Sequence, residues 1–262
     1  MKKHPLKTAI LISGSGSTME SILKASFYGE LKNMIDPVLI ISSRPNAGGI
    51  EKAQKIGVNA KNIVTLQFSK SERKSSTDKL LQLLKKFNID VISQNGWLPL
   101  TPELIIKKYN GRIINQHPGP LDPGRGHDFG GKYMYGARVT CARIAYSWLT
   151  GRDFWTEATT HLVTPNFDEG DLLSTIHLEF DPIPHTINIS QVTARKKGLI
   201  EITQLVQKKL LPFEHKNVII TLKKFYKGNM KGWRRKIPLV QKQNYELLNQ
   251  AKQLAIKLFP DG

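Results

Sequence analysis

Residues 8–23 read "TAILISGSGSTMESIL", and this stretch decides the fold class. Four of its first five residues are apolar, and Thr8, Ile10 and Ile12 are β-branched, which is typical of a buried strand. The Gly/Ser segment 14–18 favours a tight turn, and the apolar residues after it recur at helical spacing. The stretch therefore predicts a strand, a turn and a helix in direct succession.

The same alternation continues through the first half of the chain. Short apolar runs at 37–41, 89–93 and 111–115 are strand-like, and helix-like stretches at 50–57, 76–87 and 101–109 follow or separate them. This order predicts an α/β fold with a mostly parallel sheet and helices on both faces.

The pattern changes after residue 131. We expect a helix over 135–151, two half-buried strands over 159–165 and 172–180, and a long amphipathic helix over 187–211. After Pro212 the run "NVIITL" (217–222) predicts a further strand, and a closing helix is expected around 243–258.

Composition limits the classes of protein that this chain can represent. The 262 residues are 40% hydrophobic, and no apolar segment approaches the roughly 20 residues that span a bilayer. Cys141 is the single cysteine, which excludes an internal disulfide and favours a reducing, cytoplasmic location. The seven histidines show no metal-ligand spacing, so no metal site is expected.

The formal charge of +18 is unevenly distributed. Residues 195–262 hold 16 Lys and Arg against 4 Asp and Glu. Such a basic region can bind nucleic acid through phosphate contacts. Lys outnumbers Arg and no aromatic stacking pattern accompanies it, so a solvated basic surface is the favoured interpretation.

The turn Gly14, Ser15, Gly16, Ser17, Thr18 matches neither the dinucleotide pattern G-x-G-x-x-G nor the P-loop, which requires a lysine. Its free amides and the following helix N-terminus can hold a phosphate or sulfate. An ordinary tight turn between strand and helix is the alternative.

Three polar residues suggest a reaction centre. Asn115 and His117 end a strand and, two positions apart, point to the same side of it. Asp168 lies in a turn between two strands, expected near the sheet's carboxyl end, where open α/β sheets place their sites. An amide donor, an imidazole and a carboxylate suit acyl transfer without a covalent intermediate. The alternative is a polar strand end with a capping histidine.

Four segments, taken in order, resemble the folate-dependent formyltransferases over roughly residues 7–210. They are "ILISGSGSTMESIL", "IISSRPNAGGIEKAQKIGV", "NQHPGPL" and "THLVTPNFDEGDLL". The resemblance implies a Rossmann-like sheet, 10-formyltetrahydrofolate as cosubstrate, and Asn115, His117 and Asp168 as the catalytic residues. It further implies phosphate binding by residues 14–18, a folate pocket near Trp97, Leu98, Val163 and Phe167, and a family histidine at His161.

The resemblance also implies an acceptor and a domain division. The expected acceptor is a phosphorylated amine, foremost phosphoribosylglycinamide in purine biosynthesis. A catalytic domain is expected over 1–211 and a basic C-terminal extension over 212–262. The chain departs from the family pattern after His117, and we expect the loop from Gly119 to Tyr135 to act as a mobile lid, with Arg125 and Lys132 meeting the phosphate. Glu201 is the expected acidic residue for the acceptor.

Other readings remain open at this point. Within the family they are transfer to methionyl-tRNA or an amino sugar, and hydrolysis of the folate donor. A non-catalytic RNA-binding protein on the same core is the alternative from another class. A homodimer is compatible with the sequence.

Overall fold

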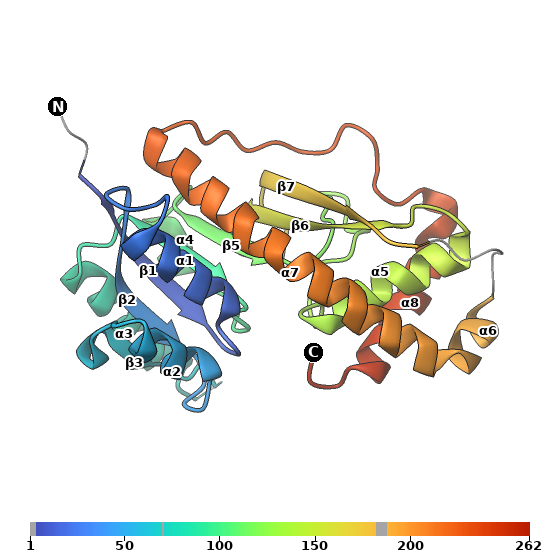
Figure 1. Ribbon diagram of the computed structural model, residues 1–262, viewed down its shortest axis with the longest axis horizontal. Helices are drawn as coiled ribbons and strands as arrows, with labels where there is room; N and C mark the ends of the chain where they lie inside the picture. The colour runs from blue at the N-terminus through green and yellow to red at the C-terminus, as the bar shows by residue number, and fades with distance from the viewer. Residues whose placement is uncertain (1–3, 70, 182–187) are drawn as a thin grey trace.

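The computed structural model describes residues 4–69, 71–181 and 188–262, and these form one seven-stranded sheet in the order β3-β2-β1-β4-β5-β6-β7 (Figure 1). The strands are β1 (Leu6–Ile12), β2 (Ile35–Ser42), β3 (Ile63–Thr65), β4 (Val91–Asn95), β5 (Ile113–His117), β6 (Trp155–Leu162) and β7 (Leu172–Glu179). The first five are parallel, and β6 and β7 are antiparallel to their neighbours. The expected mostly parallel α/β fold is confirmed.

The described residues also form eight α-helices. They are α1 (Ser17–Tyr28), α2 (Gly48–Lys55), α3 (Arg73–Lys86), α4 (Glu103–Lys108), α5 (Ala137–Thr150), α6 (Ile189–Ala194), α7 (Lys196–Lys227) and α8 (Tyr245–Leu258). None of them is long and apolar enough to cross a membrane.

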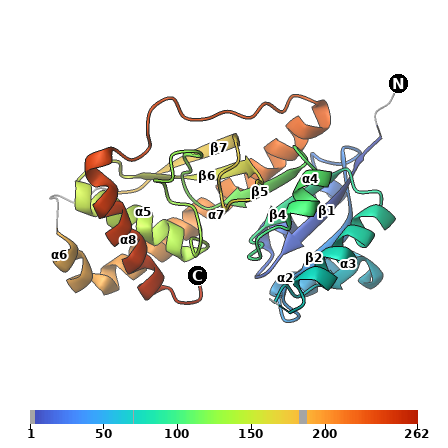
Figure 2. The same cartoon turned by 180° about the vertical axis from the view of Figure 1, so that it is seen from behind.

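Two hydrophobic cores cover the two faces of the parallel strands. Because side chains alternate along a strand, Ile10 and Ile12 of β1 enter the core under α1 and α7, while Ala9 and Leu11 enter the core under α3 and α4. Figures 1 and 2 show the helices of the two faces from opposite sides. Burial on both faces explains why the strands are continuous apolar runs.

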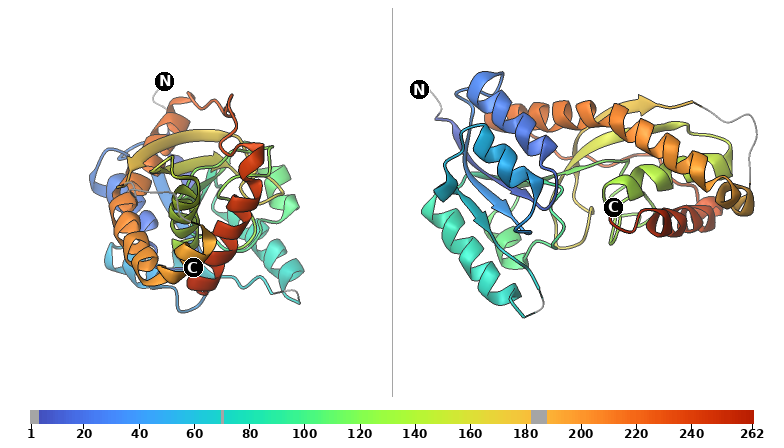
Figure 3. Two further views of the ribbon diagram at one scale, coloured as in Figure 1. Left: turned by 90° about the vertical axis from the view of Figure 1, so that its right-hand side faces the viewer. Right: turned by 60° about the horizontal axis from the view of Figure 1, so that its bottom comes forward.

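A third core lies around α5, beyond the parallel strands. Residues 137–149 of this helix are all buried, and α6, α7 and α8 pack around it (Figures 2 and 3). α5 is therefore covered on every side, and its buried polar residues need partners: Arg138 donates to the Phe259 carbonyl and Arg143 to the Asp153 carbonyl. Burial raises the pKa of the Cys141 thiol in α5 to about 12, so this cysteine stays protonated.

The predicted strand over 217–222 is wrong. These residues belong to α7, a 32-residue helix that contains Pro212 and crosses the sheet. Val218 and Leu222 are four residues apart, so both reach the core shared with α1. The division expected at 211/212 therefore falls inside a helix. The helix expected over 187–211 is interrupted at Arg195, which separates α6 from α7, and its residue 187 lies outside the described residues.

Asn217 fixes α7 to the antiparallel strands. Its side-chain amide is fully buried and donates to the carbonyls of Ala158 and Ser174 at 3.0 Å, and to the Thr160 hydroxyl at 3.1 Å. One side chain of the helix thus bonds both β6 and β7.

We predict that Asn217→Ala lowers the free energy of unfolding by roughly 2–4 kcal/mol, because two buried carbonyls lose a donor. Urea denaturation measures the change. The exposed Lys216→Ala on the same helix should stay within about 0.5 kcal/mol of the parent. Equal stability of both variants would show that this amide does not hold α7 on the sheet.

Candidate functional site

A cavity of about 910 Å³ opens at the carboxyl ends of β1, β4 and β5. Residues 13–18 follow β1, residues 95–98 begin with the last residue of β4, and residues 115–118 include the last three residues of β5. All of them line this cavity. The carboxyl ends of parallel strands are where open α/β sheets bind ligands. The cavity is therefore the candidate active site.

The pairing of β5 with β6 places two polar side chains opposite each other. Asn115 is the register partner of His161, and the Asn115 amide Nδ2 lies 3.0 Å from His161 Nε2. His161 Nδ1 lies 2.7 Å from the carbonyl oxygen of Leu162, to which it donates. The imidazole of His161 is thereby fixed at both nitrogens.

Asp168 completes the group from the turn after β6. Its Oδ1 lies 3.3 Å from His161 Nε2, and its Oδ2 lies 3.7 Å from His117 Nδ1 and accepts from the Gly131 amide at 2.9 Å. Burial acts to raise the pKa of Asp168, but the positive charge that His117 carries at acid pH and the contact with His161 outweigh it and lower this pKa to about 2. Asp168 is therefore a carboxylate at neutral pH.

His117 is the last residue of β5, and its side chain is buried. Its Nε2 lies 3.2 Å from the Phe129 carbonyl oxygen, which can only accept, so Nε2 carries the proton of the neutral ring. That leaves Nδ1, the nitrogen facing Asp168, as the basic atom. Burial lowers the pKa of His117, and the Asp168 carboxylate partly opposes this. A neutral imidazole ready to take up a proton is the result.

The Gly/Ser turn presents the start of α1 to the same cavity. Gly16 has a φ of 69° and its Cα faces Gly49 so closely that an added Cβ would lie 2.5 Å from the Gly49 Cα. No side chain of the described residues caps the first turn of α1. Free amides and the positive end of the helix therefore face the cavity, which suits an anion.

The structure brings most of the predicted binding residues together. Trp97, Leu98 and Phe167 line the cavity, as does Lys132. Val163 does not line it, since this residue packs partly buried against the core under α3 and α4. Glu201 is exposed on α7 and lies outside the lining too.

Arg125 is a correction to the expected phosphate site. Its guanidinium bonds Asp122 at 2.6 Å and the carbonyls of Arg235 and Lys236 at 3.0 and 3.2 Å, and the residue does not line the cavity. These contacts hold the loop against the segment before α8.

The expectation of a mobile lid over 119–135 is likewise corrected. Leu121 and Phe129 are fully buried, and Asp122 also accepts from the Leu239 amide at 2.8 Å. A loop with buried apolar anchors is a packed wall of the cavity.

The sequence reasoning missed Glu214, which lines the cavity from α7. Burial raises the pKa of this carboxyl to about 8, so it is largely protonated at neutral pH. The sequence does carry a pattern that points to Glu214, because Gln207, Leu211 and Glu214 recur at helical spacing and all line the cavity. We expected the helix to end before Pro212, so Glu214 was not assigned to the same helix face as Gln207. Arg44 and Lys208 also line the cavity and add two cations to Lys132.

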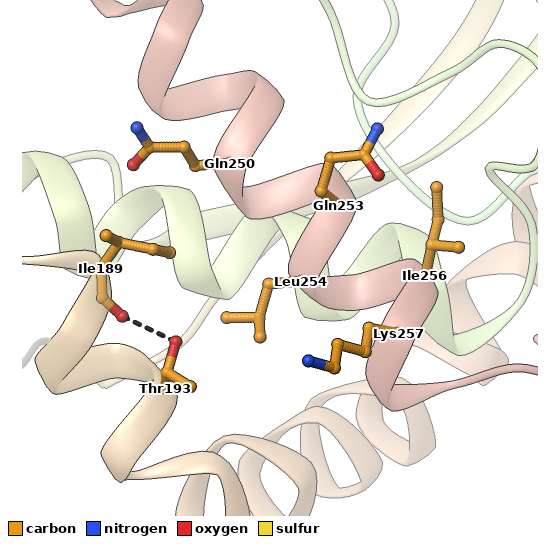
Figure 4. Close-up of a pocket in the computed structure, with 7 residues that line it drawn as sticks. All are labelled: Ile189, Thr193, Gln250, Gln253, Leu254, Ile256 and Lys257. Atoms are coloured by element: carbon orange, nitrogen blue, oxygen red, sulfur yellow. Dashed lines mark hydrogen bonds between the residues drawn. The ribbon is translucent and has the colours of Figure 1, made fainter.

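A second cavity, of about 450 Å³, lies between α6 and α8 (Figure 4). Ile189, Leu254 and Ile256 give it apolar walls, and Thr193 faces it while donating to the Ile189 carbonyl at 2.8 Å. Lys257 is the one ionisable side chain among its described lining residues. No histidine, carboxylate or thiol is among these lining residues, so we place the chemistry in the first cavity.

Comparison with known proteins agrees with this geometry. The family model described as "Formyl transferase" matches residues 6–202. This chain belongs to the formyl transferase family. It is 32% identical over 169 residues to the chloroplastic phosphoribosylglycinamide formyltransferase of Vigna unguiculata, covering 64% of this chain and 49% of that protein. The enzyme of the same name from Schizosaccharomyces pombe is 32% identical over 117 residues, covering 42% of this chain and 56% of that protein.

The fold is also similar to solved structures of the family. The glycinamide ribonucleotide transformylase 1 of Symbiobacterium toebii has a TM-score of 0.63 at 22% identity, covering 86% of this chain and 89% of that chain. The formyltetrahydrofolate deformylase of Pseudomonas putida has a TM-score of 0.60 at 15% identity, covering 86% and 66%. At these identities the likeness concerns the fold. The chain spans about half the length of the plant relatives that it matches.

We predict that the imidazole of His117 titrates below its ordinary value of 6.5 and that Asp168→Asn moves this titration lower still. The carboxylate raises the His117 pKa, so removing its charge must lower it. An NMR titration of the ring checks the direction. Asp181→Asn, an exposed carboxylate beyond the far end of β7, should leave the His117 titration in place. A rise in the pKa of His117 on removing the Asp168 charge would contradict the assigned electrostatics.

Proposed function

We propose that this protein transfers the formyl group of 10-formyltetrahydrofolate to the amine of phosphoribosylglycinamide. The observation that supports this most is the grouping of Asn115, His117 and Asp168 in one cavity with an anion-binding turn. The plant and yeast relatives carry the name of this activity. A cytoplasmic location forms part of the same proposal.

The residues divide the reaction between them. The amine nitrogen attacks the formyl carbon, and the carbonyl oxygen gains negative charge, which the Asn115 amide can stabilise. His117 accepts a proton from the attacking amine at Nδ1, and Asp168 stabilises the resulting imidazolium across 3.7 Å. The bond from the formyl carbon to folate N10 then breaks, and N10 takes up a proton. His161 Nε2 lies 3.0 Å from the Asn115 amide nitrogen and 3.3 Å from Asp168 Oδ1, so it can accept from the amide or, when protonated, donate to the carboxylate.

The cavity has separate surfaces that suit the folate and the phosphorylated acceptor. Trp97, Leu98 and Phe167 offer an apolar and aromatic surface for the folate ring system. The start of α1, with Arg44, Lys132 and Lys208, offers amides and cations for a phosphate. Glu214, protonated or charged, can bond the hydroxyls or amine of the acceptor.

Hydrolysis of the donor is the second candidate, since a deformylase shares the fold. A hydrolase has no need of a phosphate site, whereas this cavity combines a free helix N-terminus with three cationic side chains. The two reactions are separated by measuring tetrahydrofolate release from 10-formyltetrahydrofolate with and without each acceptor. Release that needs phosphoribosylglycinamide supports the proposal, and equal release without any amine would replace it with hydrolysis.

We predict that His117→Ala lowers kcat by about 10²–10⁴, the usual effect of removing a general acid–base. Turnover of the purified, folded variant is the measurement. His127→Ala is the matched control: this histidine stacks on Tyr245 with ring centroids 3.5 Å apart and does not line the cavity. Near-parental turnover in the His117 variant would remove the imidazole from the mechanism.

We also predict that Lys132→Ala raises the acceptor KM roughly tenfold and leaves the donor KM unchanged, because one charge-assisted phosphate contact is lost. Arg125→Ala is the control from the same loop, because its guanidinium is held by Asp122 away from the cavity. It should lower stability and leave the acceptor KM within about twofold. The reverse pattern, with KM responding to Arg125 alone, would place the phosphate elsewhere.

A further inference from the structure

The loop behind the active site is organised by one carboxylate. Asp128 Oδ2 accepts from the Asp122 amide at 2.7 Å, and its Oδ1 accepts from the Gly130 amide at 2.8 Å. The loop then contacts both reacting groups, through the Phe129 carbonyl to His117 and the Gly131 amide to Asp168. Small movements of residues 129–131 would therefore displace the imidazole and the carboxylate together.

A single peptide group within this loop lies between a cation and Asp168. Its N–H, from Gly131, donates to Asp168 Oδ2 at 2.9 Å, and its carbonyl oxygen, from Gly130, accepts from Lys252 Nζ at 2.9 Å. The peptide is packed tightly: a Cβ on Gly130 would lie 2.5 Å from Leu121 Cδ2 and 2.8 Å from Asp168 Cβ. The order ammonium, peptide, carboxylate aligns the peptide dipole with both charges, and hydrogen bonds arranged in this way strengthen one another.

Lys252 comes from α8, which follows the residues that the family model matches. The lysine is partly buried and lines a separate cavity of about 240 Å³ on the outer side of the loop, together with Asn249 and Glu169. Burial lowers the pKa of Lys252, while the charges of Asp128 and Asp168 raise it. These two carboxylates thus attract the ammonium toward the loop.

We propose that Lys252 is a positioning residue for the reaction: its ammonium, through the Gly130–Gly131 peptide, fixes the carboxylate of Asp168 for its work with His117. The role rests on the proposed formyl transfer. It assigns a function in the active site to the final helix, outside the part of the chain that the family model covers. Lys252 does not line the main cavity, so it acts through the loop and not on a substrate.

Lys252→Met tests the proposal, because it keeps the length and packing of the side chain and removes the charge. We expect kcat to fall on the order of tenfold, with both KM values within about twofold of the parent, since a hydrogen bond of a charged group is lost behind the site. Amide hydrogen exchange of residues 129–134 should accelerate in the same variant. Lys257→Met, an exposed position on the same helix, should change neither quantity.

Lys252→Ala provides a second and more specific readout. Truncation opens space next to the 240 Å³ cavity, so ethylammonium added from solution should restore part of the lost kcat. Tetramethylammonium at equal ionic strength has no N–H to donate and should restore none. Rescue by both salts would show a general salt effect and overturn the proposal.

The outcomes separate this proposal from the proposed function. Unchanged exchange in Lys252→Met, or faster exchange with parental kcat, overturns the positioning role. If the parent protein transfers no formyl group, the proposed function is wrong, and the positioning role falls with it, whereas faster exchange would still show that Lys252 holds the loop.

Discussion

The antiparallel pairing of β6 with β5 is the constraint on which the rest of the site depends. Five parallel strands bring the Gly/Ser turn, residues 95–98 and Asn115 to one edge of the sheet, but they supply no carboxylate there. Because β6 runs in the opposite direction, it sets His161 against Asn115 and ends where the turn of Asp168 can fold back over His117. Asp168 adopts a φ of 57°, an uncommon conformation for a residue with a side chain, which the surrounding contacts hold in place.

Much of this arrangement was predictable from the sequence, because short-range patterns encode it. Alternation of apolar strands with amphipathic helices gave the parallel sheet, and the two-residue spacing of Asn115 and His117 put both side chains on the cavity. Their proximity to Asp168 followed from expecting its turn at the carboxyl end of the sheet. The strand β3, only three residues long, carries too little pattern to be recognised.

The errors arose where tertiary contacts override local preference. "NVIITL" has a strand-forming composition, yet its buried Asn217, Val218, Thr221 and Leu222 fit a helix whose face is covered by the sheet. Because of that error, Glu201 and not Glu214 was expected to be the acidic residue that contacts the acceptor. Arg125 was expected to meet a phosphate from a glycine-rich loop, but two of its partners, the carbonyls of Arg235 and Lys236, lie more than a hundred residues along the chain. No local pattern specifies such contacts.

The residues that follow the part matched by the family model, 203–262, do more than add positive charge, because they also support the loop beside the active site. The segment 233–239 holds the loop through Arg125 and Asp122, and α8 supplies Lys252 to the peptide that bonds Asp168. These contacts explain why a long glycine-rich loop can serve as a rigid wall, since rigid support of reacting groups is what catalysis by positioning requires.

The most direct test of the central claim follows the formyl carbon itself. The protein would be given 10-formyltetrahydrofolate labelled with ¹³C in the formyl group, together with phosphoribosylglycinamide, and the label followed by NMR. Our account predicts that the label moves to the acceptor nitrogen as a formamide and that this movement is lost with Asp168→Asn. Label appearing as free formate, or transfer that persists without the carboxylate, would contradict it.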